Sequence, residues 1–294
     1  MSDTLLDLSN KIDPQTSRLL AIIKRTAETL GIPFYVTGAT ARDMILEFGY
    51  AIPAGRRTED IDLAVMIKGW KDFQQLKDVL VATGEFAVDT RIMHRLVYQK
   101  MLPVDVIPFG PIAAPTGVIT WPDQDRSMTV LGFQEIMEHC IPVRIRDGLE
   151  VSVAPLAGMA VLKLIAWNER RGSAPEKDAA DLALLFTHYV QAGNMDRLYE
   201  EHPDLLVSEE HDHDRAGARL LGQDMARMMS PQTRSEVLAI LRSQADPENN
   251  NDRLIIALSR QLGGDTYEEA HILLDCLRRG IEETFSGHAT GSTS

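Results

Sequence analysis

Three aspartates interrupt two apolar segments in the first half of the sequence. Asp60 and Asp62 lie two apart within residues 60–65, and Asp105 lies within the apolar run 104–107. Both segments are rich in β-branched residues, so we predict that both are strands. Residues two apart on a strand project from one face, which would place the carboxylates of Asp60 and Asp62 together. Such a pair favours a cation, and Mg²⁺ binds through one or two carboxylates together with substrate phosphates.

Asp105 would add a third carboxylate to this site. An unpaired carboxylate is costly inside an apolar strand, so Asp105 is expected to have a partner. Three strand-borne carboxylates could hold two metal ions about 3.5–4 Å apart, with Asp105 as the candidate base for an attacking hydroxyl. Two alternatives remain open. Asp60 and Asp62 could be solvated surface acids, and Asp105 an edge-strand acid facing water.

A small-residue turn provides a candidate phosphate site. Gly38, Ala39 and Thr40 lie between a predicted strand at 34–36 and a predicted helix at 41–48. Free backbone N–H groups and the helix dipole attract phosphate at such a position, and the Thr40 hydroxyl could add a hydrogen bond. The alternative is an ordinary strand-to-helix turn. The segment is not a Walker loop, because the Walker sequence pattern does not occur anywhere in the chain.

These motifs together resemble the DNA polymerase β-type nucleotidyltransferase superfamily, and more narrowly the AbiEii-type nucleotidyltransferases, over roughly residues 30–190. The resemblance rests on two segments: residues 36–43, which contain Gly-Ala-Thr-Ala-Arg-Asp, and residues 58–65, which contain Asp-Ile-Asp. The turn departs from the commoner Gly-Ser, and its spacing to Asp60 is longer than in minimal members. The match to CCA-adding enzymes and poly(A) polymerases is weaker, because their later basic motif is absent from the sequence.

The resemblance implies an NTP such as ATP as substrate, two Mg²⁺ ions on the three aspartates, and Arg42 beside the nucleotide. Arg57, in the loop before Asp60, could reach phosphate or be an ordinary loop charge. Many AbiEii-type proteins are toxins of toxin–antitoxin or phage-defence pairs, so a cognate antitoxin and an RNA such as tRNA are the implied partners.

Four residues of the second half match a further AbiEii-like pattern: a lysine followed by a Lys-Asp…Asp element. Carried over, Lys163 would contact the triphosphate across a cleft, and Lys177, Asp178 and Asp181 would line or brace that cleft. The alternative is a solvated helix face with a Lys177–Asp181 ion pair.

The pattern of elements predicts an α+β nucleotidyltransferase head followed by an all-helical bundle. Alternation and β-branched residues favour a mixed sheet with one or two helices up to residue 154, and amphipathic helical spacing dominates afterwards. We therefore expect a catalytic domain at 1–154, a helical domain at 155–286 and a flexible tail at 287–294, with the active site between the two domains.

Composition narrows the class of protein. The 294 residues are 44% hydrophobic and carry a net charge of −13, which disfavours a protein whose whole surface binds nucleic acid but allows a local basic cleft. No apolar run could span a membrane and the first residues carry acids, so we expect a cytoplasmic protein without a membrane partner.

The sequence therefore predicts an enzyme that transfers a nucleoside monophosphate from an NTP to an acceptor. The resemblance implies an RNA, such as the acceptor end of tRNA. Two alternatives stay open: a nucleotidyltransferase that acts on a small molecule or protein, and a catalytically silent nucleotide-binding interaction protein.

Overall fold

The computed structural model describes residues 5–53, 60–122, 126–170, 175–245, 252–263 and 266–286. The chain forms two compact units, Met1–Pro155 and Leu156–Ser294. The first contains the strands and the second, within the described ranges, contains helices only. The α+β class with a C-terminal helical part is thus confirmed.

The first unit is built on an eight-stranded mixed sheet in the order β1-β9-β10-β2-β3-β6-β5-β4. Its strands are β1 (Leu6–Asp7), β2 (Phe34–Thr37), β3 (Ile61–Met66), β4 (Phe86–Val88), β5 (Arg95–Tyr98), β6 (Leu102–Phe109), β9 (Ile141–Arg146) and β10 (Leu149–Val153). A separate pair is formed by β7 (Val118–Thr120) and β8 (Ser127–Thr129). The central strands β2, β3 and β6 have mostly buried side chains, which places the core of the unit around them.

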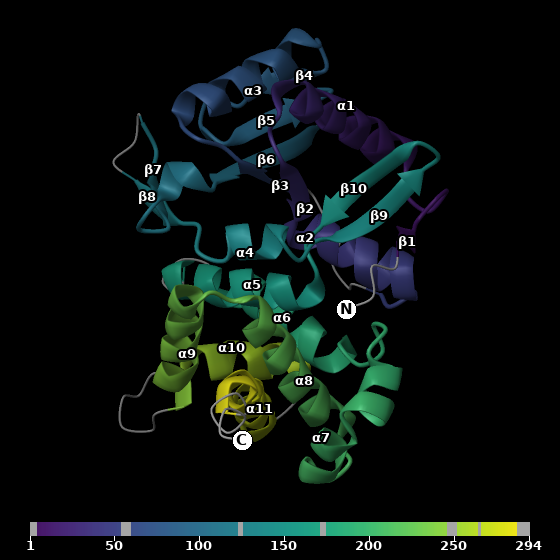
Figure 1. Cartoon of the computed structure of the whole chain (residues 1–294), viewed down its shortest axis with the longest axis vertical. Coiled ribbons are helices and arrows are strands. Elements are labelled where there is room, and N and C mark those ends of the chain that lie inside the picture. The colour runs from purple at the N-terminus through teal and green to yellow at the C-terminus, as the bar shows by residue number, and fades with distance from the viewer. Residues whose placement is uncertain are drawn as a thin grey trace, which may run out of the picture. The chain divides into compact units, whose positions relative to one another are not determined.

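Two long helices, α1 (Pro14–Leu30) and α3 (Trp70–Ala82), lie side by side along the sheet (Figure 1). Asp13 caps α1 by accepting hydrogen bonds from the backbone N–H groups of Gln15 and Thr16, which sets the start of the helix at Pro14. The shorter elements are α2 (Gly38–Asp43), the π-helical η1 (Met44–Gly49), the 3₁₀ turn η2 (Pro111–Ala113) and α4 (Phe133–Met137).

The second unit consists of α5 (Leu156–Arg170), α6 (Pro175–His188), η3 (Arg197–Glu201), α7 (Pro203–Ser208), α8 (His213–Met228), α9 (Pro231–Ala245), α10 (Arg253–Leu262) and α11 (Tyr267–Ser286). Helices α8 and α11 pack closely because glycines face the partner backbone. A Cβ built on Gly280 would lie 2.0 Å from the Arg219 carbonyl oxygen. None of the helices in the described ranges is long and apolar enough to cross a membrane.

Candidate active site

The central strands bring two of the predicted carboxylates together. β3 runs parallel to β6, and their register pairs Asp62 with Asp105. β3 also runs antiparallel to β2, where Asp62 pairs with Thr37, the last residue of β2. Directly paired residues on neighbouring strands project to the same face, with strands about 4.8 Å apart. The two aspartates therefore lie side by side at the end of β2.

Asp60 occupies a bend immediately before β3 and not the strand itself, which corrects the predicted strand at 60–65. Its backbone is held from outside the sheet, because the Thr40 hydroxyl donates a 3.2 Å hydrogen bond to the Asp60 carbonyl oxygen. The Asp60 carboxylate lies 3.5 Å from the Arg95 guanidinium. Asp60 thus reaches the site through a loop conformation that Thr40 fixes.

Gly38 makes a close approach to Asp62. Its φ is +65°, a value at which side chains are strained, and a Cβ built there would lie 2.0 Å from Asp62 Oδ2. The chain turns at this one residue, and α2 already begins at Gly38. The predicted separate turn at 38–40 is therefore wrong, because the positive φ of Gly38 lets strand pass directly into helix.

Arg95, which was not singled out from the sequence, is the cation of the site. The register of β5 and β6 pairs Arg95 with Asp105. Its guanidinium donates hydrogen bonds of 2.6 and 2.8 Å to the two carboxylate oxygens of Asp105, and these bonds raise the pKa of Arg95. Asp105 is only 8% exposed, so this two-point contact provides the partner that a buried carboxylate requires.

His94 completes the surroundings of Asp105. Its Nε2 lies 3.8 Å from Asp105 Oδ2, and its ring packs against the buried Trp121 ring with the centroids 5.4 Å apart. Burial lowers the pKa of His94, while the charge of Asp105 acts in the opposite direction. The Asp105 carboxylate therefore has two neighbours: the Arg95 guanidinium, which is hydrogen-bonded to it, and the half-buried imidazole of His94.

The donor set suits a hard cation such as Mg²⁺, because it consists of carboxylate oxygens on a rigid sheet. Within the described ranges, however, no three His, Cys, Asp or Glu side chains are close enough together to hold a metal ion. The Arg95 guanidinium contacts both Asp60 and Asp105 and supplies positive charge to both. Arg95 therefore donates to both Asp105 oxygens, which are the atoms that a metal ion would use.

The other predicted nucleotide-binding residues of the first unit that the structure describes are buried. Ala39 and Thr40 are buried in α2. Arg42 is also buried, and its guanidinium donates hydrogen bonds of 2.8 and 2.6 Å to the Asp43 carboxylate. These contacts favour a packing role for Arg42. Arg57 lies outside the described residues.

In the second unit, helices α5 and α6 hold Lys163 between two aspartates. Its ammonium lies 3.4 Å from Asp178 and 2.5 Å from Asp181. Asp178 has no exposed surface and also accepts two hydrogen bonds from Arg170. Asp181 forms its ion pair with Lys163. The solvated-face alternative had assumed an ion pair between Asp181 and Lys177. These contacts brace α5 against α6.

A family model described as "Nucleotidyl transferase AbiEii toxin, Type IV TA system" matches residues 19–250 of the chain. No curated protein matches this chain. Among solved structures, the antibiotic-resistance factor ANT(2'')-Ia is 15% identical, with 69% of this chain and all 100% of that chain covered and a TM-score of 0.39.

An antigenic nucleotidyltransferase-like protein from Paracoccidioides brasiliensis is also 15% identical, covering 67% of this chain and 93% of that chain with a TM-score of 0.39. The Thermotoga maritima CCA-adding enzyme, solved with tRNA, is 13% identical, with 98% of this chain and 85% of that chain covered and a TM-score of 0.27.

Proposed function

Because the chain belongs to the AbiEii nucleotidyl transferase toxin family and is a nucleotidyltransferase, we propose that it transfers a nucleoside monophosphate from an NTP to an RNA, with tRNA as the first candidate, in a Mg²⁺-dependent reaction. We further propose that it acts as the toxin of a toxin–antitoxin or phage-defence pair. The NTP-dependent transfer follows from the family; the acceptor, the metal and the biological role are the proposal.

One observation supports the proposal that the reaction takes place at this site. Asp62 and Asp105 lie in register on neighbouring parallel strands, and Gly38 keeps the space beside Asp62 free of a side chain. A rigid sheet holds the two carboxylates at fixed separation, which is the preorganisation that phosphoryl chemistry requires. Asp60 joins them from the loop that Thr40 anchors.

The proposed roles follow from these surroundings. Asp105 accepts the proton of the acceptor hydroxyl, whose oxygen attacks the α-phosphorus while pyrophosphate leaves. The hydrogen bonds from Arg95 lower the basicity of both Asp105 oxygens, so release of one of them would favour this proton transfer. Asp60, Asp62 and Asp105 would be the magnesium ligands, and bound magnesium would neutralise charge on the phosphates and the leaving pyrophosphate.

Arg95 has a proposed second position in this scheme. Its guanidinium contacts Asp60 and Asp105, and a metal ion on these carboxylates would take over the positive charge that it supplies there. The displaced guanidinium would then lie beside the site, where it could pair with a phosphate of the nucleotide.

The experiment is to incubate the purified protein with Mg²⁺, each labelled NTP and total cellular RNA, and to follow label transfer and pyrophosphate release. Asp60→Asn and Asp62→Asn remove charge without changing shape. The matched control is Asp78→Asn, an exposed aspartate on α3 of the same unit. We expect label on RNA with the native chain and Asp78→Asn, and a loss of about 10²-fold or more with the two site variants.

Other outcomes would change the proposal in defined ways. Label on the protein itself or on added metabolites, with RNA unlabelled, would overturn the RNA acceptor and favour the second acceptor class, which the net charge of −13 makes chemically reasonable. Equal activity of Asp62→Asn and the native chain would overturn the site. Growth arrest on expression that Asp60→Ala relieves would support the toxin role, and arrest that persists would contradict it.

A further inference from the structure

The first unit has an open hollow of about 610 Å³ that is formed by α1, the segment before it, the α3–β4 connection and the end of β9. None of the proposed active-site residues lines it. We propose that this hollow is a second ligand site, which binds the phosphate group of a phosphorylated small molecule of nucleotide size.

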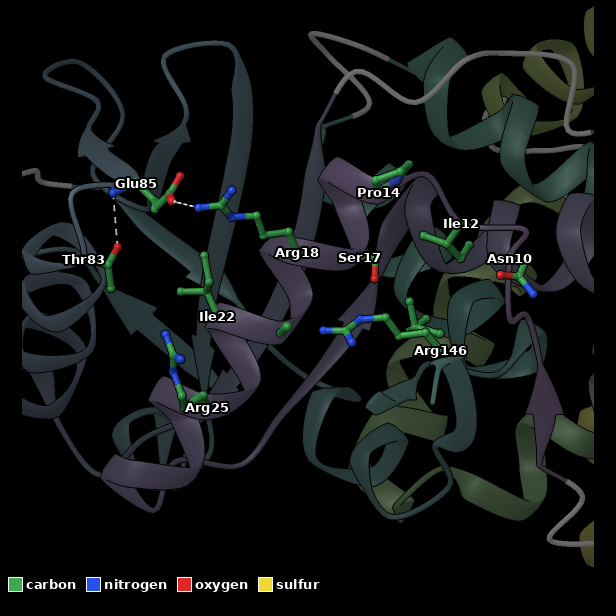
Figure 2. A pocket seen from close by; sticks show the side chains of 12 residues that line it. Asn10, Ile12, Pro14, Ser17, Arg18, Ile22, Arg25, Thr83, Glu85 and Arg146 are labelled. Atoms are coloured by element: carbon green, nitrogen blue, oxygen red, sulfur yellow. Dashed lines mark hydrogen bonds and ion pairs between the residues drawn. The ribbon is translucent and has the colours of Figure 1, made fainter. Parts of the chain in front are cut away.

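Three arginines line the hollow, and Arg18 is the only one of them that is paired with a described residue. Arg18 is paired with Glu85, so their charges cancel (Figure 2). Arg25 and Arg146 have no hydrogen-bond or ion-pair partner for their guanidinium groups in the described part of the chain. Guanidinium groups bind phosphate oxygens through paired N–H donors. The hollow therefore has an unbalanced positive charge on a protein whose net charge is −13.

The spacing of the residues on α1 explains why these groups gather. Ser17, Ala21 and Arg25 are four apart along the helix, and Arg18 and Arg25 are seven apart, so all four lie on one face. Arg146 approaches this face from the last position of β9. One helix face and one strand end thus form the two sides of the hollow.

Ser17 provides an independent observation that points to a ligand in this hollow. It is 7% exposed, and its hydroxyl oxygen is buried without a hydrogen-bond partner in the described structure. Figure 2 shows this hydroxyl directed toward the Arg146 side chain across the hollow. An oxygen of a bound phosphate would accept hydrogen bonds from both the Ser17 hydroxyl and the Arg146 guanidinium. A rotation of the Ser17 side chain or a shift of Arg146 would open the path to the hydroxyl.

The size and lining favour a small molecule over a polyanion. The half-buried side chains of Ile12 and Ala21 add apolar surface beside the arginines, as suits a ligand with an organic body and an anionic end. An extended nucleic acid would instead need a basic track, which the charge of the chain opposes.

The test uses the full chain in EDTA, which removes divalent metal from the proposed active site. Inorganic phosphate and AMP are titrated by calorimetry into the native chain, Ser17→Ala and the double variant Arg25→Ala/Arg146→Ala. The matched control is Lys71→Ala/Lys100→Ala, which removes the same charge from exposed positions of the same unit outside the hollow. We expect saturable binding that weakens about tenfold or more in the arginine variant and severalfold in Ser17→Ala. The control should bind like the native chain.

Ser17→Ala separates a binding role from a structural one. Removal of an unpaired buried hydroxyl should raise the melting temperature, so this variant is expected to fold at least as well as the native chain. A raised melting temperature together with weaker AMP binding supports the proposal. Unchanged AMP binding in Ser17→Ala and in the arginine variant would overturn it, as would binding of an RNA oligonucleotide but of neither small probe. Because the proposed reaction is lost in Asp62→Asn while this binding should be retained, failure of one proposal is distinguishable from failure of the other.

Discussion

Arg95 and Asp105 face one another across the antiparallel strands β5 and β6, and the guanidinium holds both carboxylate oxygens through hydrogen bonds of 2.6 and 2.8 Å. The same guanidinium lies 3.5 Å from Asp60. One side chain of the protein thus neutralises two of the three aspartates. Without it, these carboxylates would repel each other next to Asp62.

Replacement of Arg95 by Met should therefore make the site more dependent on metal. In EDTA, we expect Arg95→Met to lose about 1–3 kcal/mol of the free energy of unfolding, because Asp105 is left without its hydrogen-bonded cation. Added Mg²⁺ should stabilise this variant more than the native chain, since the Arg95 guanidinium no longer competes for the Asp60 and Asp105 carboxylates. Thermal unfolding with and without Mg²⁺ measures both effects.

The control for this experiment is Arg91→Met, an exposed arginine four residues earlier in the chain. It should leave both the stability in EDTA and the shift caused by Mg²⁺ close to those of the native chain. An equal Mg²⁺ shift in Arg95→Met and the native chain would contradict competition between arginine and metal.

A substitution at Gly38 should separate backbone strain from damage to the site. Gly38 and Gly31 have φ values of +65° and +64°, but a Cβ at Gly38 meets Asp62 Oδ2 at 2.0 Å, whereas one at Gly31 meets nothing within 4 Å. Both alanine variants should lose about 1–2 kcal/mol of stability from the left-handed conformation. Only Gly38→Ala displaces Asp62, so we expect it alone to lose about 10²-fold in transfer activity. Equal activities of the two variants would show that the approach to Asp62 is unimportant.

The sequence was sufficient for the elements that carry the aspartates, because β3 and β6 are continuous apolar segments interrupted only by Asp62 and Asp105. It was insufficient for the short pair β7 and β8, which each have three residues and little periodicity. Arg95 was missed because its role depends on register. Antiparallel pairing of strands about residue 100 would have placed Arg95 opposite Asp105, so the signal was present.

The spacing of Lys163 in the sequence did not predict which groups it contacts. Its spacing relative to Asp178 and Asp181 matched a family pattern, but spacing does not say whether a lysine is held by its neighbours or directed at a ligand. Here both aspartates hold it. A contact of Lys163 with the triphosphate stays a prediction.

Stability and activity measurements on Lys163→Met can decide between these roles. The Lys163 side chain is 14% exposed, so its removal leaves Asp181 and Asp178 with less compensation inside the helical unit. We expect a loss of about 3–5 kcal/mol in urea unfolding. The matched control Lys177→Met removes an exposed lysine of the same helix pair and should change stability by about 0.5 kcal/mol or less. A Lys163→Met protein with native stability but without activity would assign Lys163 to the nucleotide.

His94 predicts how the first unit responds to acid. Burial lowers the pKa of folded His94 below its ordinary value of 6.5, against the opposing attraction of Asp105. Between the two pKa values the unfolded state binds more protons than the folded state, so the free energy of unfolding should fall as the pH drops below about 6.5. Within that window the slope from this one group is at most about 1.4 kcal/mol per pH unit.

His94→Phe keeps a ring against Trp121 but removes the titrating group, so its stability should fall less steeply over the same pH range. Urea unfolding of both proteins between pH 7.5 and pH 5, values chosen to span about one unit or more on each side of the ordinary histidine pKa, gives the difference. All other titrating groups are common to the two chains, so the difference isolates His94. Parallel pH profiles for the two proteins would mean that folded His94 gains protons as easily as the unfolded residue does, and burial beside Asp105 and Arg95 would then not govern its charge.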